Sequence, residues 1–555
     1  MGSAKSATRS WCSEKPRNKP THMQKKTLAS IIGIAAFSSA CFGQFRVSPY
    51  LLPADSTGTI RLTWFTDQDV PGKLAIWEPH TTDTQYYTPA PVRAAELNYS
   101  ALEESERDSF PDMFRNASWK HSVVLKHLKP HVTYAYRVIQ GTAHYANQFT
   151  VAPETGARTR IRFVAFADSE TDPEGRHTQR PWVPGKQAPG SSGRPQGLDN
   201  YLLTETAGFK ANLGQIKQEK PDFIVLPGDI VQGGGYQRAW DEFFFHTAGK
   251  FDDVLGQTLL LPAIGNWENF GARNGGYDPQ AVFQSRAKYK AYFPLPSNGH
   301  PDYQDTYYRV DYGPVTVITL DSSNGLPDST DNDTNINISI STYPGKDLPD
   351  ISPGSDQWKW AEAQLKDAHD AGQLIFVQFH HIPYSSGGHI LPLTAENSSG
   401  QGGGPMRAYQ PLFKKYGVVA VICGHNESLE HSLVDGIHYW DVGIAGDGLG
   451  YSLDDVDPRR HNEYRQWVAH VDAPEHWRGR QLLSGGKHYG HLVVDVVPEG
   501  DRGYQVIMTP QYIFPVTDAS GQVVSRETRV YDHVVTASVP RAPGPSYITI
   551  YKSKH

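Results

Sequence analysis

Short apolar runs alternate with amphipathic, helix-like stretches from about residue 159 onward. The runs have the length and the aliphatic and aromatic content typical of strands buried on both faces of a parallel sheet. Between them, Phe209, Leu213 and Ile216 recur at helical spacing, and so do the apolar residues of 358–368. Ser355 or Asp356 can cap that second helix. The apolar runs are residues 162–167, 222–226, 259–264, 374–379 and 418–423. Strands that alternate with helices in this way predict a layered α/β domain.

Each apolar run ends on polar residues of the kinds that bind metals. Open α/β sheets hold ligands at the carboxyl ends of their strands, so we expect these residues to meet in one pocket. Taken singly, each has a structural explanation, such as a helix cap, a turn residue or a hydrogen-bonded core histidine. Five in series favour a site. In chain order the clusters are Asp168-Ser169-Glu170, Gly228-Asp229, Gly265-Asn266-Trp267-Glu268, His380-His381 and Gly424-His425-Asn426-Glu427.

Residues 44–155 alternate apolar and polar positions between turn residues, which predicts an all-β module. Its stretch 128–138, Leu-Lys-Pro-His-Val-Thr-Tyr-Ala-Tyr-Arg-Val, resembles a strand entry of fibronectin type III sandwiches. We therefore expect a non-catalytic β-sandwich, with its three histidines at the surface. Residues 156–555 form the second domain, in which β-strands after residue 491 extend the core. The histidines are His121, His127 and His131.

The amino terminus has the pattern of an export leader, predicted to cover residues 1–43. Lys25 and Lys26 precede an apolar run that is too short to span a bilayer, and small residues follow at 38–40. We expect a periplasmic or secreted protein, with lipid anchoring through Cys41 as an alternative. The sequence predicts no transmembrane helix. The net charge of −7, with both signs interspersed, argues against nucleic-acid binding by phosphate neutralisation.

The clusters supply carboxylate, amide and imidazole groups, the usual ligands of divalent cations. A central carboxylate can bridge two ions about 3.5–4 Å apart, which is the arrangement that clamps the attacking and leaving oxygens in phosphoryl transfer. The residues of the right type at the strand ends are Asp168, Asp229, Asn266, His381 and His425.

The order of the five clusters resembles that of the calcineurin-like metallophosphoesterases. With the amino-terminal sandwich, it is most similar to the purple acid phosphatase branch, and residues 424–430 resemble that branch's Gly-His-x-His-x-Tyr-Glu stretch. The resemblance implies a four-layer α/β/β/α sandwich. It also implies a phosphoric ester hydrolase with two divalent metal ions. Asp229 would bridge the ions, and Asn266, His381 and His425 would complete one site. His380 competes with His381, which we prefer because Ile382 and Pro383 complete the family's His-x-Pro.

The second metal site departs from the family pattern. Glu427 stands where the family has a second histidine, and Glu170 stands in the Asp-x-His position, although the purple acid phosphatase branch does not use that position as a ligand. Gln232 replaces the branch's chromophoric tyrosine, and Trp267 replaces the histidine of Gly-Asn-His-Glu. A site rich in oxygen ligands favours Mn²⁺ or Mg²⁺, with Ca²⁺, Fe or Zn²⁺ as alternatives. The indole of Trp267 cannot act as a general acid.

We therefore expect hydrolysis of a phosphorylated small molecule by a metal-bound hydroxide held between two ions, with Asp229 and His425 at the reacting centre. His389, in the loop after the fourth cluster, is the best candidate to protonate the leaving group. Four carboxylates would offset two divalent ions and disfavour a dianionic monoester, unless Glu170 points away. A phosphodiesterase and a catalytically impaired binding protein of the same fold remain alternatives.

Overall fold

The computed structural model describes residues 45–110, 114, 118–171, 179–182, 194–324, 333–338, 348–392, 394–396, 398–447, 449–450, 457–540 and 549–552. The predicted leader and Cys41 lie outside this part of the chain.

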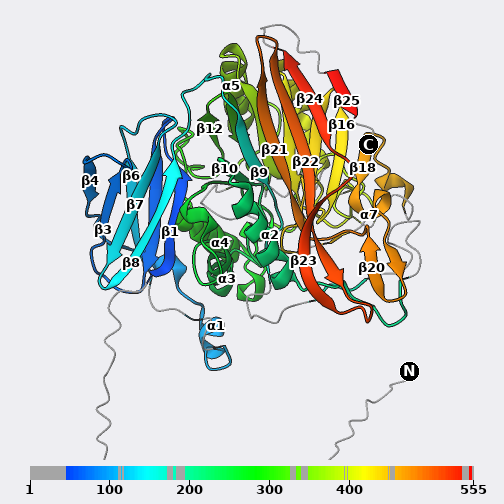
Figure 1. Ribbon diagram of the computed structural model, residues 1–555, viewed down its shortest axis with the longest axis horizontal. Helices are drawn as coiled ribbons and strands as arrows, with labels where there is room; N and C mark the ends of the chain where they lie inside the picture. Colours follow the sequence, from blue (N-terminus) through cyan, green and yellow to red (C-terminus); the bar gives the residue numbers. More distant parts are fainter. Residues whose placement is uncertain are drawn as a thin grey trace, which may run out of the picture. The chain divides into compact units, whose positions relative to one another are not determined.

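The amino-terminal module is a sandwich of two four-stranded antiparallel sheets, coloured blue to cyan in Figure 1. Its inner faces are filled by buried apolar side chains such as Leu62, Trp64 and Tyr136. One sheet runs in the order β1 (Phe45–Pro53), β2 (Ile60–Thr66), β6 (Trp119–Leu125) and β5 (Val92–Arg93). The other runs β4 (Thr84–Tyr87), β3 (Lys73–Trp77), β7 (Thr133–Gln140) and β8 (Ala143–Thr150).

His121 was expected at the surface, and that expectation is wrong. Its side chain is fully buried on β6. The ring stacks on Trp64 with centroids 5.0 Å apart, and Nε2 lies 3.0 Å from the Thr66 hydroxyl. A stacked imidazole with one hydrogen-bond partner can occupy a core at little cost, provided that it stays neutral.

The rest of the chain forms the predicted four-layer sandwich, in which two mixed sheets pack face to face (Figure 1). The first sheet runs β11 (Leu259–Pro262), β10 (Phe223–Leu226), β9 (Ile161–Ala165), β21 (Gly490–Glu499), β22 (Gly503–Thr517), β24 (Val535–Pro540) and β25 (Thr549–Lys552), with β23 (Val523–Val530) paired to β22. The second runs β12 (Tyr308–Tyr312), β13 (Val315–Thr319), β14 (Leu374–His381), β15 (Val418–Gly424), β17 (Ile437–Val442), β16 (Leu429–Val434) and β18 (Arg465–Val468). A separate ribbon pairs β19 (His476–Arg478) with β20 (Gln481–Ser484).

All five predicted strands are present, with β9, β10, β14 and β15 inside their sheets and β11 at the edge of the first sheet. β9, β10 and β11 are parallel to one another, as are β14 and β15 in the other sheet. The strands after residue 491 extend the first sheet, as expected, because β21 pairs antiparallel with β9. The carboxyl ends of the five strands therefore lie on the same side of the sandwich.

Helices cover the outer faces of both sheets. Apolar residues of α2 (Glu205–Glu219), α3 (Gln237–Thr247) and α4 (Pro279–Tyr292) pack on the first sheet, and those of α5 (Asp356–Asp370) and α6 (Gln410–Tyr416) pack on the second. α5 begins as predicted, since the Ser355 hydroxyl accepts the Trp358 N–H at 3.2 Å. The short helices are α1 (Ala101–Ser105), α7 (Ala469–Asp472), η1 (Ala95–Leu97), η3 (Val254–Gly256), η4 (Trp267–Asn269), η5 (Ala272–Asn274), η6 (Gly404–Tyr409) and η7 (Pro458–Arg460). No helix within the described residues has the length and apolar content needed to cross a membrane.

The amino-terminal sandwich is packed firmly against the α/β domain. Arg46 and Asp241 form a buried ion pair of 3.0 Å across the junction. The Tyr50 hydroxyl donates to the carbonyl of Tyr292 at 2.6 Å, and the Tyr136 hydroxyl donates to that of Gly256 at 2.6 Å. Each of these buried polar groups has a hydrogen-bond or ion-pair partner, and together the contacts hold the two modules in one orientation.

Candidate metal centre

Asp229 occupies a tight turn directly after β10. Its backbone is left-handed, with φ of 48°, and the preceding Gly228 has φ of 86°. The buried Glu268 carboxylate holds this turn, because it accepts the N–H groups of Asp229 at 3.0 Å, Ile230 at 2.8 Å and Gly265 at 2.8 Å. A side chain on Gly265 would lie 2.2 Å from Oδ1 of Asp229. The Gly-Asn-Trp-Glu cluster thus shapes the turn that carries Asp229.

Backbone strain is concentrated at these strand ends. Asp168, Asp229, His425 and Glu427 all have positive φ, between 47° and 82°. For residues with a Cβ this conformation costs about 1–3 kcal/mol each, and it persists only where the surroundings enforce it. Four such residues occur in three of the five clusters. The fold therefore accepts a loss of local stability in order to position these side chains.

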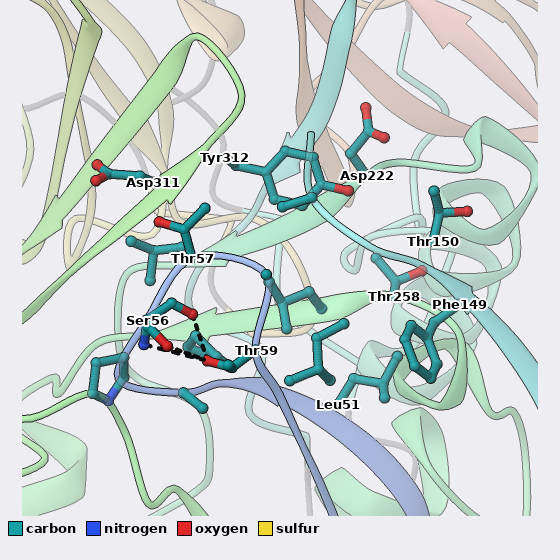
Figure 2. A pocket seen from close by; sticks show the side chains of 18 of the residues that line it. Leu51, Ser56, Thr57, Thr59, Phe149, Thr150, Asp222, Thr258, Asp311 and Tyr312 are labelled. Atoms are coloured by element: carbon teal, nitrogen blue, oxygen red, sulfur yellow. Dashed lines mark hydrogen bonds between the residues drawn. The ribbon is translucent and has the colours of Figure 1, made fainter. Parts of the chain in front are cut away.

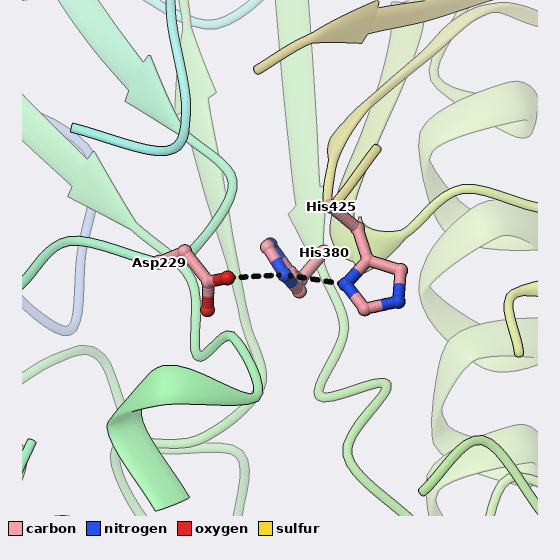
Figure 3. Close-up of side chains that lie close together, drawn as sticks. All are labelled: Asp229, His380 and His425. Atoms are coloured by element: carbon pink, nitrogen blue, oxygen red, sulfur yellow. Dashed lines mark hydrogen bonds and ion pairs between the residues drawn. The ribbon is translucent and has the colours of Figure 1, made fainter. Parts of the chain in front are cut away.

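Asp229, His380 and His425 form the first candidate group, drawn in Figure 3. Nε2 of His380 lies 3.0 Å from Oδ2 of Asp229 and 2.8 Å from Oδ1 of Asn266. Nδ1 of His425 lies 2.9 Å from the same amide oxygen and 3.1 Å from Nε2 of His380. These atoms come from four different strand ends.

Hydrogen bonds to backbone carbonyls fix which nitrogen of each ring carries the proton. Nδ1 of His380 lies 3.0 Å from the carbonyl of Pro227, and Nε2 of His425 lies 2.9 Å from that of Gln401. A carbonyl can only accept, so these nitrogens donate, and the inward nitrogens of neutral rings carry lone pairs. The inward atoms are then all acceptors. A cation between them removes the repulsion, so the donor set fits a divalent metal.

Asp168, Glu170 and Asp229 form a second group, which shares Asp229 with the first. Burial and the neighbouring Asp229 carboxylate raise the pKa values of Asp168 and of Glu170 well above their usual range. Both carboxylate oxygens of Glu170 are buried without a hydrogen-bond partner among the described residues. Three crowded carboxylates also fit a cation. Glu170 lies within this group, so the geometry makes it a candidate ligand and it does not point away from the centre.

The structure brings His380, rather than the preferred His381, next to Asp229. The pairing of β14 with β15 is irregular between Gln378 and His381, so the regular alternation of side chains does not hold at this strand end. The rings of His380 and His381 lie near each other, with centroids 5.2 Å apart, but only His380 lies next to Asp229. The His381 ring instead shares a hydrogen bond of 2.8 Å with the Ser322 hydroxyl. It still lies near the site, with its centroid 4.4 Å from that of His425.

The other predicted site residues surround these two groups. The His389 ring lies 4.6 Å from the His425 ring, and burial lowers the pKa of His389 to about 4. The backbone N–H of Trp267 donates to Oδ1 of Asp229 at 2.8 Å. Glu427 belongs to neither metal-capable group, although its charge acts on Asp168. Burial raises the pKa of Glu427, and Arg180 and Lys487 oppose that rise.

Sequence reasoning missed Lys487 and Asp441. Lys487 is buried, and its Nζ has no hydrogen-bond partner within the described part of the chain. Burial lowers the pKa of Lys487 to about 7, against the attraction of Glu427 and Asp441. Asp441 is the second-last residue of β17, which lies beside β15 in the second sheet. Lys487 follows Gly485 and Gly486 in a loop, where no periodic pattern predicts burial.

Comparisons with known proteins agree with this geometry. Residues 204–426 match the sequence model of the family described as calcineurin-like phosphoesterase. Two uncharacterized proteins from two strains of Mycobacterium tuberculosis are 24% identical over 363 residues, which is 64% of this chain. The chain spans 58% of the length of these relatives.

A purple acid phosphatase from yellow lupin (Lupinus luteus) seeds has a similar structure. The TM-score is 0.57 at 15% sequence identity, over 86% of this chain and 73% of the lupin chain. At this identity the similarity concerns the fold alone. Together with the family match and the two packed sheets, it confirms the predicted architecture. Residues 204–426 thus match the calcineurin-like phosphoesterase family, and the fold of the chain is similar to that of a purple acid phosphatase.

Proposed function

We propose that this protein hydrolyses phosphate esters with two divalent metal ions. The observation that carries the proposal is the all-acceptor cluster around Asp229. Nε2 of His380 lies 2.8–3.1 Å from an amide oxygen, a carboxylate oxygen and Nδ1 of His425, an arrangement of acceptors that only a proton or a metal cation can stabilise. Burial opposes the charge on His380, yet Asp229 raises the pKa of that ring.

Asp229, Asn266, His380 and His425 would hold one ion, and Asp168, Glu170 and Asp229 would hold the other. Mn²⁺ and Mg²⁺ suit the oxygen-rich second group best. Bound ions of this kind activate water and neutralise the charge of the phosphoryl group. Asp229 is the shared ligand, and Glu268 keeps its turn in place through three N–H groups.

Residues near His425 and Asp229 would assist the reaction by holding a proton and by fixing a ligand. The His389 ring lies beside His425 at the edge of the two groups, where it would be next to an ester bound at the centre. A dianionic phosphoryl group would raise the pKa of this ring, so that it can hold the proton that the departing oxygen needs. The backbone N–H of Trp267 keeps Oδ1 of Asp229 from rotating away.

A phosphodiester substrate is the second candidate, and the carboxylate count favours it. Asp168, Glu170, Asp229 and Glu427 offset the charge of two divalent ions, and the buried Asp441 lies close by. Such a centre attracts a monoanionic diester more readily than a dianionic monoester. Lys487 partly compensates through its attraction to Glu427 and Asp441.

The test compares turnover of p-nitrophenyl phosphate and bis-p-nitrophenyl phosphate by the purified protein with Mn²⁺ or Mg²⁺. Chelator and Asp229→Asn should each abolish turnover, while the exposed Tyr86→Ala control keeps it. The ratio of the two rates decides between monoester and diester. Inertness toward both substrates with Mn²⁺, Mg²⁺, Ca²⁺, Fe²⁺ and Zn²⁺ would contradict the proposal and favour a binding protein of this fold.

A further inference from the structure

A cavity of about 1230 Å³ lies between the amino-terminal sandwich and the α/β domain (Figure 2). Its walls are the turn between β1 and β2, the end of β8, the end of α2, and parts of β12 and α5. Asp222 and Thr258 line it directly before β10 and β11, whereas the metal centre follows the carboxyl ends of those strands. The two sites therefore occupy opposite ends of the same sheet.

Neutral polar side chains dominate the walls of this cavity. Hydroxyl and amide groups come from both modules, and several of the hydroxyl side chains surround the space in Figure 2. Such groups both donate and accept hydrogen bonds, so they match a ligand that is itself rich in hydroxyl groups. Examples are Thr57, Thr150, Thr258, Gln218, Gln257 and Gln364.

The charges on the walls do not favour an anion. Five aspartates line the cavity, against Lys217, Lys220 and Arg309. Lys217 is paired with Asp252 at 2.8 Å, and Arg309 is paired with Asp311 at 2.9 Å and with Asp367 at 2.6 Å. Two of the three cations are thus already neutralised, and a phosphorylated ligand would meet net negative charge.

Aromatic rings supply part of the apolar lining, beside aliphatic residues such as Leu51 and Ile60, and among these rings Phe149 and Tyr312 are almost fully buried. Phe149, Tyr312 and Trp360 come from β8, β12 and α5, and the Tyr312 hydroxyl lies beside Asp222. Trp360 is partly exposed and packs against Tyr307 with ring centroids 4.9 Å apart. The C–H faces of sugar rings pack on aromatic rings, while their hydroxyls bond to amides and carboxylates.

We propose that this cavity binds a neutral oligosaccharide. Ligand pockets usually measure about 300–1,000 Å³, so a space of about 1230 Å³ suits a chain of sugars better than a single one. Binding here does not depend on the metal centre. The site would hold a glycan, or a glycan-linked ester, while the opposite end of the sheet does chemistry.

The experiment is calorimetric titration of the full-length protein with cellopentaose, penta-N-acetylchitopentaose and maltopentaose at up to millimolar concentrations. At least one of these sugars should bind. Trp360→Ala should weaken that binding by about tenfold or more, because a stacking face is lost. Tyr312→Phe changes one atom in a packed ring, so it tests the site without endangering the fold, and it should weaken binding severalfold.

Tyr86→Ala, on the exposed edge strand β4, is the matched aromatic control and should bind as the wild type does. All three variants should keep the wild-type rate with p-nitrophenyl esters. The proposal is overturned if none of the three sugars binds, or if Trp360→Ala and Tyr312→Phe both bind with unchanged affinity. It is also overturned if tripolyphosphate, used as an anionic probe, binds in the cavity and the sugars do not.

Discussion

Nδ1 of His380 donates to the carbonyl oxygen of Pro227 over 3.0 Å, and this one bond turns the lone pair of Nε2 toward Asp229. Pro227 lies two residues before Asp229, in the turn that ends β10. The same turn therefore carries a ligand and orients its partner. Contacts of this kind, behind the atoms that face a metal, set the tautomer and raise metal affinity.

Adjacent histidines on β14 give a sharp test of the ligand assignment. His380→Ala should lower the number of bound Mn²⁺ ions and reduce kcat/KM by at least about 10²-fold, because it removes an inward nitrogen. His381→Ala, the matched control, should keep the metal content, since its ring bonds to Ser322 instead. Metal analysis of both purified variants decides the question. The reverse result would restore His381 as the ligand.

Gly265→Ala should disrupt the centre without removing any ligand. Its new Cβ would lie 2.2 Å from Oδ1 of Asp229 and 2.3 Å from the Asp229 nitrogen, so the turn must move. A displacement of about 1 Å can cost about 10²-fold in rate. Gly214→Ala is the control, because nothing lies within 4 Å of its added Cβ in α2, and it should stabilise by about 0.5–1 kcal/mol. Equal rates for the two variants would contradict the steric argument.

A leaving-group series tests His389. If His389 protonates the departing oxygen, His389→Asn should slow an alkyl phosphate by about 10²-fold or more. It should slow p-nitrophenyl phosphate much less, because nitrophenolate leaves without a proton. Steady-state kcat values for both esters, with Tyr86→Ala as control, measure the difference. An equal loss for both esters would assign His389 to substrate binding.

Buried His121 should make stability depend on pH. Burial lowers its pKa to about 4, while the unfolded chain titrates near 6.5. Between these values the unfolded state binds a proton that the folded state does not. The free energy of unfolding should therefore fall as pH drops from 6.5 toward 4, by up to about 3 kcal/mol.

Urea unfolding at several pH values checks this dependence. His121→Phe keeps a ring on Trp64 but cannot titrate, so part of the slope should disappear. The exposed His127→Asn should leave the slope unchanged, and its backbone φ of 58° suits asparagine. A His121→Phe slope identical to that of the wild type would show that other histidines account for the whole effect.

Local sequence was enough to predict the strands, their order along the chain and the side of the sheet on which the site lies. Buried parallel strands are continuous apolar runs, and a polar residue directly after such a run must emerge at its carboxyl end. Asp168, Asp229, Asn266 and His425 were found in this way, and the structure brings all four strand ends together. The helix that begins at Asp356 could also be predicted, because its cap and its apolar face depend on residues within a few turns.

Contacts between distant segments decided the rest. Whether His380 or His381 contacts Asp229 depends on the irregular end of β14, where the pairing with β15 shifts between Gln378 and His381, and such an irregularity has no signal in the local sequence. Glu170 joins the second group because the left-handed turn at Asp168 redirects the chain, and such a turn has no periodic signal. His121 is buried by contacts within the sandwich, Lys487 is buried within the α/β domain, and the cavity lies between the two modules, so all three depend on segments that are distant in the sequence. Hydrophobic periodicity reports which residues leave water, whereas the partners they meet are set by the three-dimensional fold.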